Sequence, residues 1–137
     1  DMPTDAHQIA RSVARLNRRL RQERHSDLTP TQMSVLGAIR QLGEATPSAI
    51  AAFERVQPPS ITRTLTSLVE AGMATRAPHP DDGRQVLMSV SERGEAVLAE
   101  ERSRRDLWLS HRLTELTATE RRTLKEAAAL MERLSTL

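Results

Sequence analysis

The sequence of 137 residues contains no cysteine, which excludes disulfide bonds, thiolate metal sites and redox sensing through cysteine. It also has no apolar stretch long enough to cross a bilayer, and no signal peptide is evident. These absences fit an intracellular protein. We therefore expect a cytoplasmic location and no membrane partner.

Aromatic residues are almost missing, because Phe53 and Trp108 are the only two. A core must then be built from Leu, Val, Ile, Ala and Met. The hydrophobic share of 38% is slightly low for a self-contained globule of this length. Helices that bury their apolar faces only against a second copy of the chain would fit such a composition.

Lysine is nearly absent as well, since Lys125 is the single one and the other basic residues are arginines. Arginine suits bidentate contacts to phosphate and guanine, although a GC-rich coding bias would also enrich it. The formal net charge is only +2. Bulk charge alone is thus a weak argument for a nucleic-acid partner.

The apolar spacing predicts six helices, with one β-hairpin between the fourth and the fifth. The first helix is expected over about residues 5–24, with the segment 25–27 (His-Ser-Asp) as its break. Thr29 and Gln32 have the spacing of a capping box that starts the second helix, and Gly43 is placed to end it. The apolar stripe expected on this second helix consists of Met33, Leu36, Ile39 and Leu42.

A third, short helix follows Thr46, with Ile50 and Phe53 expected to face inward. The fourth helix is opened by two adjacent prolines. A residue that precedes proline avoids the α region, so we expect Pro58 to be the cap and Pro59 the first helical residue. Proline is tolerated there, because the first N–H groups of a helix have no internal partner.

Turn-forming residues dominate the segment 78–83, and apolar residues alternate with others in 84–90. This pattern predicts a β-hairpin with an exposed tip. Ser91 is expected to cap a long charged helix that reaches about residue 112. Thr117 and Glu120 form another capping box, at the start of the last helix.

Two short helices joined by a tight break and followed by a hairpin have the order of a winged helix-turn-helix. The fourth helix fits the recognition role, because its outer face has small hydroxyls, one arginine and no acid before Glu70. An ordinary amphipathic helix with an exposed Ser/Thr-rich face would show the same pattern. The inward stripe comprises Ile61, Leu65, Leu68 and Val69; the outer residues are Ser60, Thr62, Arg63, Thr66 and Ser67.

At the expected hairpin tip, Asp82 and Arg84 flank Gly83. The carboxylate could hold the guanidinium in one pose, from which it can enter the narrow minor groove of DNA. The alternative is a solvated turn with an incidental ion pair, which stabilises by at most ~1 kcal/mol.

These segments resemble the MarR (multiple antibiotic resistance regulator) family. The resemblance rests on LTPTQMSVL, on SITRTLTSLVEAGMATR and above all on HPDDGRQVLMSVSERG, which is similar to the family's wing. Residues 28–94 resemble its DNA-binding lobe, and the flanking helices have the expected order. The family often has two basic residues after the wing aspartate, whereas here the first of these positions is Gly83.

The resemblance implies a mainly α fold with a small β-hairpin wing, in which a winged helix-turn-helix is flanked by dimerisation helices. The expected division is an N-terminal dimerisation helix at 1–27, a DNA-binding lobe at 28–91 and C-terminal dimerisation helices at 92–137. The implied function is that of a homodimeric, sequence-specific regulator, usually a repressor, on a pseudo-palindromic operator. A small aromatic or amphipathic effector would release it, and no cofactor is expected.

The resemblance also assigns residues to roles. Those expected to contact DNA are Gln57, Ser60, Thr62, Arg63, Thr66, Arg76, Asp82 and Arg84. Those expected at the dimer interface are Leu16, Leu20, Leu107, Trp108, Leu124, Leu130 and Leu134. Arg15 and Met33 are candidates for the effector pocket, although they fit plain surface and core equally well.

The sequence argues against a metal site and an enzyme, and it leaves two alternatives open. The histidines (His7, His25, His79 and His111) lack metal-ligand spacing, and His79 beside Asp81 and Asp82 fits a turn better than a metal site. No phosphate loop or nucleophile elbow is present, so an enzyme is not expected. The flanking helices could pack on each other in a monomer. The rival function is a winged-helix module that binds a protein instead of DNA.

Overall fold

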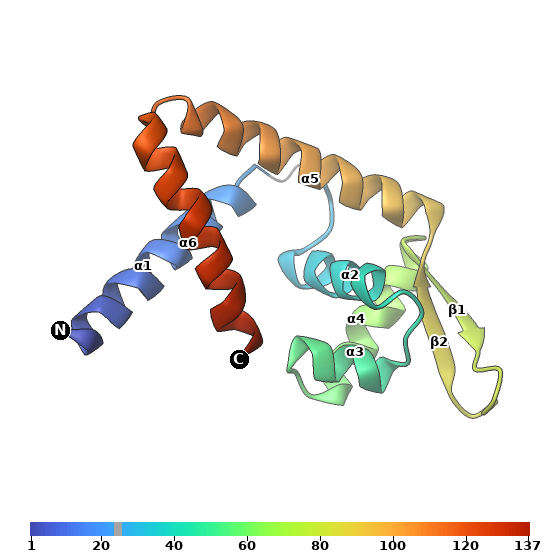
Figure 1. Cartoon of the computed structure of the whole chain (residues 1–137). Helices are drawn as coiled ribbons and strands as arrows, with labels where there is room; N and C mark the ends of the chain where they lie inside the picture. The colour runs from blue at the N-terminus through green and yellow to red at the C-terminus, as the bar shows by residue number, and fades with distance from the viewer. Residues whose placement is uncertain (24–25) are drawn as a thin grey trace. The chain divides into compact units, whose positions relative to one another are not determined.

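The structure is a computed structural model that describes residues 1–23 and 26–137 (Figure 1). In chain order the elements are α1 (Met2–Arg21), α2 (Pro30–Leu42), α3 (Pro47–Glu54), α4 (Pro58–Glu70), β1 (Ala74–Pro78), β2 (Val86–Val90), α5 (Glu92–Leu113) and α6 (Ala118–Thr136). The predicted fold class is confirmed. The first helix begins three residues earlier than expected and ends at Arg21, while the expected end at residue 24 and the break at His25 lie outside the described residues.

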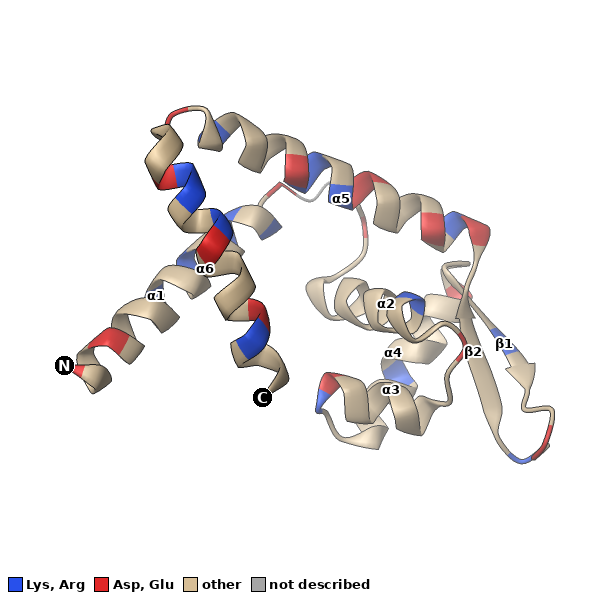
Figure 2. Ribbon diagram, viewed as in Figure 1, with Lys and Arg blue, Asp and Glu red and all other residues tan. Residues whose placement is uncertain are grey.

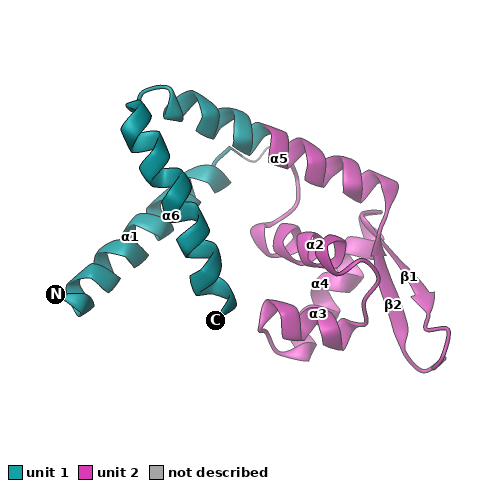
Figure 3. Ribbon diagram, viewed as in Figure 1, with its two compact units in different colours: residues 1–23, 104–137 teal, residues 24–103 magenta. Residues whose placement is uncertain are grey.

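The chain divides into two compact units (Figure 3). Residues 24–103 contain α2, α3, α4, the hairpin and the first part of α5. Residues 1–23 and 104–137 contain α1, the rest of α5 and α6. We call them the winged unit and the helical unit. Among the described helices, none has both the length and the apolar character needed to cross a membrane.

The predicted helix starts are confirmed by hydrogen bonds at their caps. Thr29 Oγ1 accepts the N–H of Gln32 at 3.1 Å, and Gln32 Oε1 accepts the N–H of Thr29 at 2.9 Å. The pair Thr117 and Glu120 forms the same reciprocal box at α6. Each box satisfies two of the donors that a helix leaves without partners at its N-terminus.

The start of α4 differs from the prediction by one residue. The carbonyl of Gln57 accepts the N–H groups of Ser60 and Ile61, so Gln57 is the cap and Pro58 is the first helical residue. Both prolines fit the first turn, because the N–H groups they lack would have no partner inside the helix. This outweighs the tendency of a residue before proline to avoid the α region.

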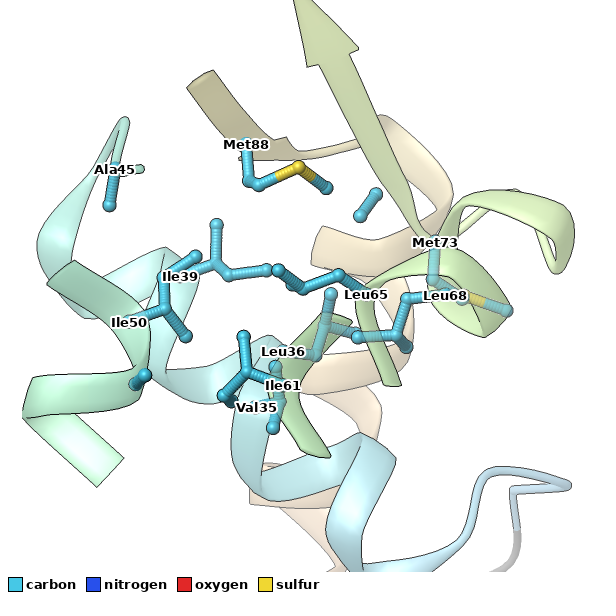
Figure 4. Close-up of a cluster of buried hydrophobic side chains, with 12 residues drawn as sticks. Val35, Leu36, Ile39, Ala45, Ile50, Ile61, Leu65, Leu68, Met73 and Met88 are labelled. Atoms are coloured by element: carbon cyan, nitrogen blue, oxygen red, sulfur yellow. The ribbon is translucent and has the colours of Figure 1, made fainter. Parts of the chain in front are cut away.

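The core of the winged unit lies between the three short helices and the base of the hairpin (Figure 4). Met88 comes from β2, and the backbone of the same residue pairs with Ala45 through N–H···O bonds of 2.8 and 3.1 Å. Both the side chain and the backbone of Met88 therefore anchor the hairpin to the helices. The largest fully buried side chains are Leu36, Ile39, Ile50, Ile61, Leu68 and Met88.

Two of the expected inward residues are exposed instead. Phe53 on α3 is 44% exposed, because the buried face of that helix centres on Ile50 and Ala51 and the aromatic ring lies to one side of it. Leu42 on α2 is 38% exposed. A stripe with a strict three-residue spacing drifts round a helix of 3.6 residues per turn, so Leu42 points opposite to Met33.

The base of the wing is locked to the start of α5. Ser91 Oγ donates to the carbonyl of Gly72 at 2.7 Å and accepts the N–H of Gly94 at 3.0 Å, which confirms Ser91 as the cap. A Cβ at position 94 would collide with the carbonyl of Met73. Glycine is therefore required there by close packing. The hairpin itself is antiparallel, with Ala74 opposite Val90 and Pro78 opposite Val86.

Candidate nucleic-acid interface

The outer face of α4 is polar and nearly free of charge. Its only charged residues are Arg63, in the middle, and Glu70, at the end (Figure 2). The inward stripe of Ile61, Leu65 and Leu68 is buried, as predicted, and it holds the opposite face outward. All five residues expected to contact the major groove are exposed, namely Gln57, Ser60, Thr62, Arg63 and Thr66.

The hydroxyls of this face are turned back onto the helix. Thr62 Oγ1 donates to the carbonyl of Pro58 at 3.2 Å, and Thr66 Oγ1 donates to that of Thr62 at 3.0 Å. Each oxygen keeps its acceptor capacity for an incoming donor. Ser67, expected on the outside, is half-buried, because it accepts from Gln32 Nε2 at 3.1 Å and donates to Thr64. It joins α2 to α4 instead of facing outward.

Acidic and basic residues are neighbours at the tip of the hairpin (Figure 2), and the side chains of Asp82 and Arg84 form an ion pair there. Asp82 Oδ1 accepts the backbone N–H of Arg84 at 3.1 Å and its Nε–H at 3.2 Å. Asp82 Oδ2 accepts from Gln85 Nε2 at 3.3 Å. The backbone N–H of Arg84, and then its guanidinium, lower the pKa of Asp82. The carboxylate is thus ionised at neutral pH, and it orients an arginine that is 92% exposed.

Arg76, the remaining residue expected near DNA, is exposed on β1 opposite Met88. It lies on the same hairpin as Arg84, two residues after the start of β1 at Ala74. The described structure therefore brings the winged-unit candidates together on two elements, α4 and the hairpin.

Two features of the winged unit were missed by the sequence analysis. Arg55, between α3 and α4, is the single residue other than glycine with a positive φ in the described chain, at φ 56° and ψ 46°. His79 Nδ1 accepts the backbone N–H groups of Asp81 and Asp82. The flanking Pro78 and Pro80 did indicate a turn, but an imidazole acceptor has no sequence pattern of its own.

The residues expected at a dimer interface lie in the helical unit, where apolar side chains are largely uncovered. Neither α1 nor α6 has a buried residue. Leu107 is 62% exposed and Leu134 is 64% exposed. Leu16, Leu124 and Leu130 are exposed too, while Leu20 and Trp108 are half-buried.

The two candidates for effector contacts belong to different units. Met33 is buried in the winged unit, and Arg15 is exposed on α1 of the helical unit. Within residues 1–23 and 26–137, no group of three or more potential ligands could hold a metal ion. His79 uses its Nδ1 for the turn, next to the two aspartates with which a site had been considered.

Comparison with known proteins finds transcription regulators in each case. A sequence model of the MarR family matches residues 28–86. An uncharacterized HTH-type transcriptional regulator of Mycobacterium bovis is 45% identical over 127 residues, covering 92% of this chain and 89% of the relative. The multiple antibiotic resistance protein MarR of Salmonella typhimurium is 36% identical over 100 residues, covering 72% of this chain and 69% of the relative.

Solved structures show the same likeness over nearly the whole chain. A putative transcriptional regulator from Pseudomonas aeruginosa is 33% identical, with a TM-score of 0.87 over 98% of this chain and 95% of its own. A mutant MarR of Escherichia coli complexed with operator DNA is 26% identical, with a TM-score of 0.67 over 96% of this chain and 98% of its own.

Proposed function

The chain belongs to the MarR family of transcription regulators, and we propose that it is a homodimeric repressor that binds a pseudo-palindromic operator in the cytoplasm. Members of this family are regulators and not enzymes. The observation that carries the proposal is the surface of the winged unit. The outer face of α4 has Arg63 and no acidic residue before Glu70, and the same folded unit contains a hairpin whose tip presents an oriented arginine.

In this proposal α4 enters the major groove. Small hydroxyls allow close approach, and the central Arg63 can donate two hydrogen bonds to O6 and N7 of a guanine. Gln57, Ser60, Thr62 and Thr66 would then contact base edges or phosphates. The MarR structure with operator DNA supports this assignment, since its chain is similar to this one over nearly the full length.

The hairpin would contact the adjacent minor groove through Arg84. A narrow, A·T-rich minor groove has a strongly negative potential that attracts arginine. Asp82 holds the guanidinium before binding, which reduces the conformational entropy lost on contact. Arg76 on β1 would lie near the DNA backbone. Replacing Arg84 by alanine should therefore weaken binding most on operators with A·T-rich flanks.

The homodimer is proposed because the helical unit cannot cover its own apolar surface. Of the thirteen large apolar side chains that are exposed in the described chain, ten belong to the helical unit. A second copy related by a two-fold axis would cover them with the same residues from the other side. It would also present two copies of α4 to half-sites that are about one DNA turn apart.

We also propose that a small aromatic or amphipathic effector releases the repressor. This part rests on family membership, with Arg15 as the proposed partner for an acidic group of the effector. Titration of small aromatic carboxylic acids into the protein–DNA complex tests it. Release of DNA that is lost in an Arg15→Ala variant would support the assignment, and release by none of the acids would contradict it.

The test of DNA binding is fluorescence anisotropy on duplex DNA from upstream of the gene, against a scrambled duplex, over a series of salt concentrations. A repressor should prefer the upstream duplex strongly, and its affinity should fall steeply with salt because phosphate contacts release counterions. Equal affinity for the upstream and the scrambled duplex would count against a repressor. If genomic fragments also showed no preference, the rival function of a winged-helix module that binds a protein would be favoured.

A further inference from the structure

The tip of the hairpin is organised around one imidazole. His79 donates its backbone N–H to the carbonyl of Gln85 at 3.0 Å, which closes the turn at its base. Its side chain bends over the same turn, where Nδ1 accepts the N–H of Asp81 at 3.0 Å and that of Asp82 at 3.2 Å. Pro80, which lies between His79 and Asp81, has no N–H group and cannot compete for this acceptor.

These bonds fix the chemical form of the ring. A nitrogen that accepts two N–H groups carries no hydrogen itself, so the neutral imidazole has its hydrogen on Nε2. The ring then acts as an asparagine does in an Asx turn, where a side-chain acceptor binds the N–H two residues further along. Pro78 and Pro80 restrict the backbone on both sides of this residue.

The fixed turn leads directly to the exposed arginine. The same residue that donates its N–H to the imidazole, Asp82, accepts the backbone N–H and the Nε–H of Arg84. Asp82 is further held by Gln85, whose N–H donates to the Asp82 carbonyl at 3.0 Å. The order of contacts is thus His79, then Asp82, then Arg84.

We propose that His79 is a positioning residue for DNA binding: its neutral imidazole holds Asp82, and Asp82 holds Arg84 in the pose that enters the minor groove. The proposal rests on the DNA-binding function proposed above, since it concerns how the wing presents Arg84 to DNA. His79 itself needs no contact with DNA for this role. It acts by reducing the number of conformations that the tip samples before binding, and therefore the conformational entropy lost on binding.

Protonation of the imidazole should disrupt this arrangement. A hydrogen on Nδ1 would face the two N–H donors and abolish both bonds. The imidazolium would be attracted to the carboxylate of Asp82, so it would compete with Arg84 for Asp82.

The decisive variants are His79→Ala and His79→Asn, each with and without Arg84→Ala. His79→Ala should weaken operator binding by roughly threefold to tenfold, the range expected when hydrogen bonds that order a contact are lost. His79→Asn should restore most of the affinity, because its Oδ1 can accept the N–H of Asp81. In the Arg84→Ala background, His79→Ala should have almost no further effect, since residues that act through one contact are not additive.

His7→Asn, on α1 and outside the winged unit, is the matched control and should bind the operator as the unmodified protein does. Full additivity of His79→Ala with Arg84→Ala, or an unchanged affinity in His79→Ala, would overturn the proposal.

A measurement without DNA separates this proposal from the one it rests on. Long-range ¹H–¹⁵N correlation spectra of the full chain at pH 8 should show His79 with its hydrogen on Nε2. A hydrogen on Nδ1 would overturn the positioning role even if the protein binds an operator. The expected spectra, combined with no operator preference in any duplex, would confirm the arrangement of the tip and contradict the DNA-binding function on which its role depends.

Discussion

The guanidinium of Arg19 lies over the ring of Trp108, with its central carbon 4.9 Å from the ring centroid. Arg112, one turn further along α5, lies 5.1 Å from the same centroid. Arg19 also donates to Glu23 Oε1 at 3.0 Å, near the end of α1. A single half-buried aromatic ring therefore connects α1 with α5 in a unit that has few other buried contacts.

Replacing Arg19 by alanine should lower the free energy of unfolding by about 1 kcal/mol, because a cation–π contact contributes about 0.5–1 kcal/mol at a partly exposed site and the ion pair adds little. Urea unfolding can be followed by the fluorescence of Trp108, the single tryptophan. Arg21→Ala, an exposed arginine of the same helix, is the control and should change the stability by less than about 0.5 kcal/mol. Equal effects of the two variants would contradict a role for the ring contact.

Arg55→Gly should raise the free energy of unfolding. Arg55 has left-handed backbone angles, φ 56° and ψ 46°, at the end of α3. This conformation costs a residue with a side chain about 1–2 kcal/mol, whereas glycine adopts it freely but loses more entropy on folding. The net gain should be about 0.5–1 kcal/mol by chemical unfolding. Arg55→Ala retains the strain and is the matched control; a gain in that variant too would assign the effect to the lost charge.

The contribution of Asp82 to stability should depend on pH in a defined direction. Arg84 lowers the pKa of this carboxyl, so the folded state favours the ionised form more than the unfolded state does. The stabilisation is complete above about pH 4 and is lost as the pH falls through the lowered value. Unfolding measured between pH 6 and pH 2.5 should show a smaller acid-induced loss in Asp82→Asn than in the unmodified protein. Identical losses would mean that the ion pair contributes nothing to the fold.

Arg63→Ala should reduce the preference for the operator over scrambled DNA by about 1–3 kcal/mol, if the arginine contacts a guanine. Competition anisotropy with single-base variants of the operator locates the position at which discrimination is lost. Arg102→Ala, on the exposed side of α5, is the charge-matched control and should leave the preference unchanged. Equal weakening on every sequence would reduce Arg63 to a phosphate contact.

The parts of the fold that depend on neighbours in sequence could be predicted. Thr29, Thr117 and Ser91 form their caps with residues three positions away, so the pattern alone specifies the contact. The pairing of Asp82 with Arg84 is equally local. The order of helices and hairpin could be predicted from these caps and turn residues together with the apolar spacing.

The errors concern contacts that depend on three-dimensional packing. Phe53 was expected inside, but the position of α4 and α2 around α3 selects Ile50 and Ala51 as the buried face. Ser67 is drawn inward by Gln32, which is 35 positions away in sequence. The role of the His79 ring depends on how the turn folds back over it. None of these contacts has a periodicity that a single sequence reveals.

Leu134→Glu should convert the proposed dimer into monomers. Leu134 is 64% exposed on α6, a helix without any buried residue, and a two-fold interface would place two copies of the new charge in apolar surroundings. Burying a leucine stabilises by about 1.5–3 kcal/mol, and the two copies together should raise the dissociation constant by at least about a hundredfold. Light scattering coupled to size exclusion measures the mass directly.

Leu42→Glu makes the same change at an exposed leucine of the winged unit and should leave the mass unchanged. A monomeric mass for the unmodified protein would refute the dimer, whereas dissociation in both variants would indicate general misfolding, because only the change at Leu134 places a charge in the proposed interface.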